Sequence, residues 1–172
     1  GEAIFFFFFS NRLGASALMQ GLADGYFILP YTIGDYLATS KFPAMKPEDS
    51  AFTGITREVQ HRIDMLMGVG GKTPADDFHK ALGKVMWDKV GMARSTGGLQ
   101  EAIKTIGSLR ESFWHDLALT GTENDLNKQL EQANRLADYL ELGALMARDA
   151  LMREESCGGH FRDEHQTPEG EA

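Results

Sequence analysis

The sequence predicts a mainly α-helical protein built on an antiparallel bundle of three helices. After residue 47, apolar residues recur at the three- and four-residue spacing of a helix with one buried face. Capping and helix-terminating residues divide this pattern into long segments with short connections, which favour antiparallel neighbours. The alternating pattern that is typical of strands is nearly absent.

The expected helices have clear boundaries. Thr73 and Pro74 form a cap with proline in the first turn, which is typical of a helix start. Residues 95–98 and Gly121 interrupt the apolar pattern, as segments that end helices do. The helices expected between these breaks are 48–67, 75–90, 99–117 and 122–153.

The first part of the chain has a different character. Ile4–Phe9 contains five consecutive phenylalanines and is interpreted as a buried strand. This run is too short to span a bilayer and lacks the basic region of a signal peptide. Residues 13–28 and 31–37 are expected to be helices, and 40–47 is expected to be a connector, since it holds two prolines.

Composition excludes several classes of protein. The chain has 172 residues, of which 42% are apolar and 24% charged, as in a globular domain with a real core. Its net charge of −8 argues against a nucleic-acid-binding protein, which would present a basic face. The single cysteine, Cys157, excludes an internal disulfide and cannot hold an iron–sulfur cluster, which needs several thiolates.

The polar tail after residue 154 holds possible metal ligands. Cys157, His160 and His165 lie in it, but their spacing matches no zinc motif, so no metal site is predicted. A cysteine–histidine nucleophile pair is an alternative, although nothing else in the chain supports a hydrolase. The other histidines, which are expected on helices as packing or surface residues, are His61, His79 and His115.

The segment Asn11–Leu18 is the candidate binding site. It places Arg12 beside the start of a predicted helix, where unpaired backbone N–H groups and the helix dipole attract anions. A guanidinium adds a planar pair of donors suited to a carboxylate or phosphate. The alternative is that Arg12 is only solvated or salt-bridged.

Several motifs occur in the order found in one family. They are Gly1-Glu2-Ala3, Asn11–Leu18, His79–Gly83, Phe113-Trp114, the segment 126–153 and Glu155–Arg162. With them the chain resembles the C-terminal part of the flavoprotein subunit of succinate dehydrogenase and fumarate reductase, in the FAD-dependent oxidoreductase 2 family. The resemblance covers nearly the whole chain, but only the C-terminal part of the family.

The resemblance implies a three-part organisation. Residues 1–40 would be the last part of an FAD-binding domain, and 47–154 would be a spectrin-repeat-like helical bundle. Residues 155–172 would be a tail that packs on the flavin domain. Two departures stand out: Phe8, Phe9 and Ser10 replace the family's loop of histidine and small residues, and Cys157 stands where many members have arginine.

The resemblance also implies an activity, which is the interconversion of succinate and fumarate by hydride transfer through FAD. Glu2 matches an acid that contacts FAD, and Arg12 matches the arginine that holds a substrate carboxylate. Ala17 and Leu18 match the pair whose backbone N–H groups face the pyrimidine edge of the flavin. No catalytic acid or base is expected in this chain, and FAD is expected in the full-length protein, not in this fragment alone.

The implied partners are a dicarboxylate substrate, an iron–sulfur subunit and a membrane cytochrome b subunit, with no nucleic acid and no membrane span in this chain. The implied location is the cytoplasmic side of the cell membrane, where the protein would be held peripherally through its partner subunits. The implied process is respiration. Two alternatives remain. One is a fragment of L-aspartate oxidase, a relative with a similar Asn-Arg-Leu motif, and the other is a non-catalytic helical interaction module.

Overall fold

The structure is a computed structural model that describes residues 16–156 and 159–169. Helices dominate it, so the prediction of a mainly α protein is confirmed. They are α2 (Ser16–Ala23), the π-helix η1 (Asp24–Ile28), α3 (Leu29–Thr39), α4 (Ser50–Gly68), α5 (Ala75–Lys89), α6 (Thr96–Asp116) and α7 (Lys128–Met152). Four two-residue strands accompany them: β1 (Thr73–Pro74), β2 (Ala93–Arg94), β3 (Leu117–Ala118) and β4 (Phe161–Arg162). The strand expected over Ile4–Phe9 lies outside the described residues.

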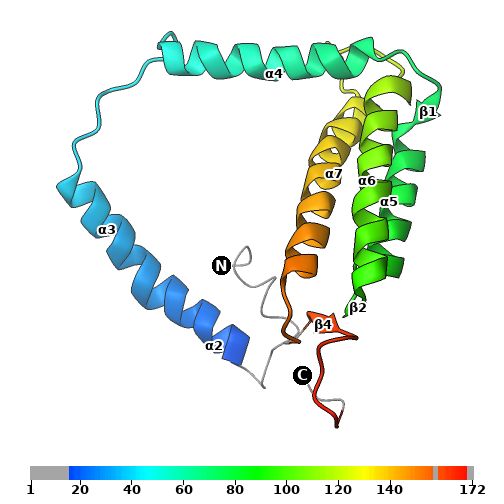
Figure 1. Cartoon of the computed structure of the whole chain (residues 1–172). Coiled ribbons are helices and arrows are strands. Elements are labelled where there is room, and N and C mark those ends of the chain that lie inside the picture. Colours follow the sequence, from blue (N-terminus) through cyan, green and yellow to red (C-terminus); the bar gives the residue numbers. More distant parts are fainter. Residues whose placement is uncertain (1–15, 157–158, 170–172) are drawn as a thin grey trace.

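Helices α5, α6 and α7 pack against one another and run in alternating directions (Figure 1). Their apolar faces form the core, because the residues that recur at helical spacing in the sequence are those that become buried. Phe113 of α6 is fully buried in it and contacts Phe78 of α5 edge to face, with ring centroids 5.7 Å apart. The larger apolar cluster also contains Leu66, Leu82, Ile106, Leu117, Leu136 and Leu140.

Each end of the bundle is closed by a short parallel strand pair. At one end β1 pairs with β3, and at the other β2 pairs with β4. In the first closure, Gly71 donates its N–H to the Leu117 carbonyl and Lys72 donates to the Asp116 carbonyl. The pairs join segments that are far apart in sequence, so they tie the helix ends together.

Helix α4 lies across one end of the bundle (Figure 1). Only its second half reaches α7, where Leu66 is buried and Arg62 donates to the Asp138 carboxylate at 2.6 Å and to the Asn134 carbonyl at 2.9 Å. The apolar stripe of α4 continues into its first half, but there Phe52 and Val59 are exposed. This half has no partner among the described residues that would cover the stripe.

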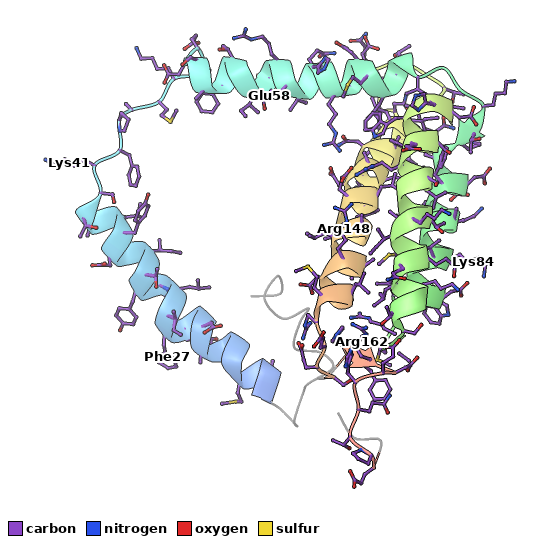
Figure 2. All side chains as sticks on the ribbon, viewed as in Figure 1. Phe27, Lys41, Glu58, Lys84, Arg148 and Arg162 are labelled. Carbon is purple, nitrogen blue, oxygen red and sulfur yellow. The ribbon has the colours of Figure 1, made fainter. Side chains whose placement is uncertain are left out.

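Residues 16–45, which we call the N-terminal arm, stand apart from the bundle (Figure 1). Pro30 lies in the first turn of α3, where a missing N–H is tolerated, so the helical run continues through the break expected between 13–28 and 31–37. Where side chains of the arm are described, none is buried. Figure 2 shows them projecting from an isolated helix, and Phe27, for example, is 69% exposed.

Candidate functional site

The four predicted binding residues fall at or before the start of α2. Ala17 and Leu18 lie in its first turn, where backbone N–H groups have no partner within the helix. The Leu18 side chain is exposed. Glu2 and Arg12 lie outside the described residues. The assignment of all four residues therefore stays a prediction.

The arm exposes many large apolar side chains beside this helix end. Its exposed large side chains come from α2, η1, α3 and the following connector, and they include aromatic residues on several sides. They are Leu18, Met19, Leu22, Tyr26, Phe27, Ile28, Leu29, Tyr31, Ile33, Tyr36, Leu37, Phe42 and Met45. A surface of this size marks an interaction site, because monomeric soluble proteins seldom expose one.

A second cluster of special residues lies where the tail meets the end of α7 (Figure 2). Arg162 is only 2% exposed. Its Nη1 donates to the carbonyls of Ala150 at 2.9 Å, Leu151 at 3.2 Å and Arg153 at 2.7 Å, and its Nη2 donates to Thr96 Oγ1 at 2.8 Å. A guanidinium thus satisfies the free carbonyls at the C-terminus of α7, where the helix dipole also favours a cation.

Glu164 adds a matching contact at the start of α6. One of its carboxylate oxygens accepts the backbone N–H of Thr96 at 2.7 Å, and the other lies 3.5 Å from Arg162 Nε. The bond from the Thr96 backbone lowers the pKa of Glu164. The tail therefore binds one helix end with a cation and the adjoining helix start with an anion.

His160 is 4% exposed and lies between Arg94 and Arg153. Arg94 Nη1 is 2.6 Å from His160 Nδ1, and His160 Nε2 is 3.4 Å from the Arg153 carbonyl. Burial lowers the pKa of His160, and the Arg153 and Arg94 charges lower it further, whereas the hydrogen bond to the Arg153 backbone and the Glu155 charge act in the opposite direction. Both ring nitrogens face partners.

An open apolar groove of about 210 Å³ runs between α5 and α7. Gly143 gives it its depth, because a Cβ there would lie 3.2 Å from Met86 Sδ. Its lining is mostly apolar, with His79 and Tyr139 as the polar side chains. Its lining residues are His79, Leu82, Gly83, Met86, Tyr139, Leu142, Gly143 and Met146.

The structure also bears on the other candidate sites. Of the three possible ligands in the tail, His160 and His165 are described, and Cys157 lies outside the described residues. Within 16–156 and 159–169, no group of three histidine, cysteine or acidic residues could hold a metal ion. In the same ranges no helix has both the length and the apolar character needed to cross a membrane. The remaining histidines are exposed on helices: His61, His79 and His115.

Sequence reasoning singled out Arg162 only as part of a family motif, and it did not point to Arg94. The available signal was the placement of two arginines near a helix start and after a helix end. That signal is weak, because arginine at such positions is usually solvated. Only the pairing of β2 with β4 reveals these contacts. It places Arg94 opposite Arg162 and next to His160, which lies 66 residues away in sequence.

Comparisons with known proteins agree on one family. Residues 79–171 match the family described as fumarate reductase flavoprotein C-term. One chain of the fumarate reductase (CoM/CoB) of Methanothermobacter marburgensis is 31% identical over 159 residues, which are 90% of this chain and 26% of the relative. The fumarate reductase flavoprotein subunit of Helicobacter pylori is 28% identical, over 88% of this chain and 21% of the relative. The L-aspartate oxidase of Nostoc is 26% identical over 89% of this chain and 27% of the relative.

Solved structures show the same fold within much longer chains. A chain of the Mycobacterium smegmatis Sdh1 complex in the apo form superposes with a TM-score of 0.74 at 22% identity, over 90% of this chain and 25% of that one. A quinol-fumarate reductase with menaquinol molecules gives a TM-score of 0.65 at 23% identity, over 77% and 22%. This chain spans about a quarter of the length of the relatives it matches. The chain belongs to the fumarate reductase flavoprotein C-terminal family.

Proposed function

We propose that this chain is the C-terminal part of a flavoprotein subunit that interconverts succinate and fumarate. The observation that carries the proposal is the family match over residues 79–171, which covers most of α5, all of α6 and α7, and nearly all of the tail. Curated relatives align beyond it, over 88–90% of this chain, and so include the segment before the bundle.

The exposed surface supports a role as part of a larger body. The chain exposes 12477 Å². A compact protein of 19.0 kDa would expose about 8,400 Å², so the excess is about 4,000 Å². We infer that the N-terminal arm packs against an FAD-binding domain, of which residues 1–40 form the last part.

The start of α2 would then bind one side of the cofactor and the substrate. FAD, when bound, supplies the relay for two electrons between the dicarboxylates. The Ala17 and Leu18 backbone N–H groups would donate to the acceptor atoms at the edge of the flavin, and a first-turn position provides such free donors. Glu2 would contact the cofactor, and the Arg12 guanidinium would orient a substrate carboxylate with two parallel hydrogen bonds.

The proposal extends to the assembly. Electrons would pass to an iron–sulfur subunit, and a cytochrome b subunit would hold the complex at the inner face of the cell membrane, with this chain on the cytoplasmic side. Support comes from the structural relatives, which are described as the Sdh1 complex and as a quinol-fumarate reductase. The tail, residues 155–172, would pack on the flavin domain while Arg162 holds it to the bundle.

The test compares the full-length polypeptide of the gene with the 172-residue chain alone. We expect flavin absorbance, succinate oxidation and fumarate reduction from the full-length protein. We expect no stoichiometric flavin from the chain alone, since the dinucleotide-binding fingerprint is absent from its sequence. A full flavin complement on the isolated chain, or no turnover of either dicarboxylate by a flavin-loaded full-length protein, would contradict the proposal.

A second candidate function is L-aspartate oxidase, which the 26% identity to the Nostoc enzyme favours. Assay of the same full-length protein with L-aspartate separates the two, because each enzyme should prefer its own dicarboxylate. A third candidate, a helical interaction module without chemistry, predicts neither flavin nor turnover in the full-length protein.

A further inference from the structure

The tail is joined to the bundle by contacts of two kinds. Two backbone bonds form the strand pair, from Phe161 N to the Met92 carbonyl at 3.1 Å and from Asp163 N to the Arg94 carbonyl at 2.9 Å. Beside them, the Arg94 side chain reaches across the pair to His160. The side-chain contact directly precedes the first backbone bond, so the two are expected to open together.

The geometry determines which nitrogen of the neutral His160 ring carries the proton. A guanidinium only donates, and it stays protonated at any ordinary pH. Arg94 Nη1 at 2.6 Å therefore requires a lone pair on His160 Nδ1. The single ring proton must then lie on Nε2, where it faces the Arg153 carbonyl at 3.4 Å. The contact exists only while the imidazole is neutral.

We propose that His160 is a pH-sensitive latch that holds β4 to β2. When Nδ1 is protonated, its N–H points at an N–H of Arg94 and the imidazolium charge faces the guanidinium charge, so β4 loosens from β2. The opening is local, because Arg162 does not titrate and keeps its bonds to the end of α7 and to Thr96. The residues that become free are those around Phe161, at the start of the strand pair. This inference does not depend on the proposed enzymatic function.

The charged groups around His160 support this direction. Arg94 faces it from β2 and Arg153 from the end of α7, and both charges lower its pKa, whereas the Glu155 charge raises it. Two carboxylates lie in the same region, Asp149 of α7 and Glu155 of the loop that follows it. Both are already engaged with Arg153, at 4.0 Å and 2.6 Å respectively.

The sign of the pH effect follows from the pKa of His160, which burial and the two arginines lower from the ordinary value of 6.5. In the open state the exposed ring takes up its proton near that ordinary value, whereas in the closed state it does so only at lower pH. The latch is therefore closed at neutral pH and weakens as the pH falls below about 6.5. Over the interval between the two pKa values, the open fraction rises about tenfold for each pH unit.

Hydrogen–deuterium exchange of the full 172-residue chain at about pH 7.5 and about pH 5.5 tests the latch. Labelling times are lengthened at the lower pH to offset the slower chemical exchange. We expect the segment around Phe161 to lose protection at the lower pH, while segments in α6 and α7 do not. Protection that is unchanged at Phe161 after this correction would overturn the proposal.

Two variants test the mechanism from both sides of the contact. His160→Asn keeps an acceptor near the position of Nδ1 but cannot titrate, and Arg94→Gln removes the opposing charge while offering a carbonyl to a protonated ring. Both should abolish the acid response. His165→Asn changes the other tail histidine and should retain it. If one of these two variants already lacks protection around Phe161 at neutral pH, the other variant provides the test. Loss of protection at low pH that persists in that other variant overturns the proposal.

Discussion

Gly71 lies against the main chain of Asp116 so closely that a Cβ on the glycine would be 2.1 Å from the Asp116 carbonyl carbon. This approach lets Gly71 and Lys72 form the first closure of the bundle. Asp116 reinforces it, since its carboxylate accepts Thr73 Oγ1 at 2.5 Å and Lys72 N at 2.9 Å. These two bonds, the hydroxyl of Thr73 first, lower the pKa of Asp116.

Gly71→Ala is therefore expected to lower the free energy of unfolding by about 1–3 kcal/mol, because the closure must separate to admit the methyl group. Urea unfolding of the full chain measures the change. Gly83→Ala is the matched control: Gly83 lies on an exposed face of α5, and a Cβ added there would have nothing within 4 Å, so alanine should stabilise the helix by up to about 1 kcal/mol. Equal effects of the two substitutions would show that the contact does not matter.

Arg162→Lys is expected to lower the free energy of unfolding by about 1–3 kcal/mol, although it keeps the positive charge. An ammonium cannot serve three carbonyls of α7 and Thr96 Oγ1 together, so buried acceptors lose their donors. Urea unfolding and exchange protection of β4 report the loss. Arg148→Lys, an exposed change on α7, should alter neither measurement. If Arg162→Lys behaves like Arg148→Lys, charge alone holds the tail.

Arg12→Lys in the full-length enzyme should lower turnover with succinate and with fumarate about a hundredfold while flavin content stays near normal. Lysine keeps the charge but loses the planar pair of donors that would hold a carboxylate in register. Steady-state rates and the flavin-to-protein ratio provide the readout, and Arg57→Lys, exposed on α4, is the control. Turnover above roughly half in both directions, where loss of orientation predicts about a hundredfold decrease, would remove the assignment of Arg12.

A chain that begins at Pro47 should fold as a cooperative helical unit and remain monomeric. The bundle core draws on residues from Leu66 onward, and none of the arm contributes to it. The full chain should associate by comparison, because the arm exposes its apolar side chains. Circular dichroism, thermal melting and light scattering make the comparison. A coil spectrum for the shorter chain would mean that the helices need the rest of the protein.

The helices of the bundle can be predicted from the sequence, whereas the short strand pairs that close its ends cannot. Helix α5 matches its expected range to within one residue because periodicity is a local signal, although Pro74 precedes the helix instead of lying in its first turn. Helix α6 begins at Thr96, inside the expected break 95–98, because Ser95 caps it by accepting from the Gly98 N–H. Helix α7 starts later than expected, because Asn127 caps it by accepting from the N–H groups of Gln129 and Leu130. The strand pairs escape prediction, since two-residue strands have no period and their partners lie far away in sequence.

The candidate site likewise has a part that can be predicted from the sequence and a part that depends on the fold. Arg12 and its neighbours are recognised through a motif, which needs no coordinates, and the described part of the chain adds only the first-turn position of Ala17 and Leu18. The surroundings of His160 could not be foreseen, because they depend on a contact with Arg94 that the fold alone creates.

The contact of Arg62 with Asp138 and Asn134 has a mechanical consequence. The bundle is fastened at both ends, and the arm is a helical rod, so each is stiff by itself. Between them, α4 touches the bundle only through its second half. Residues 40–49 join α4 to the arm without a helix of their own. A substitution of Arg62 would therefore change how α4 sits on the bundle and leave both the arm and the core residues intact.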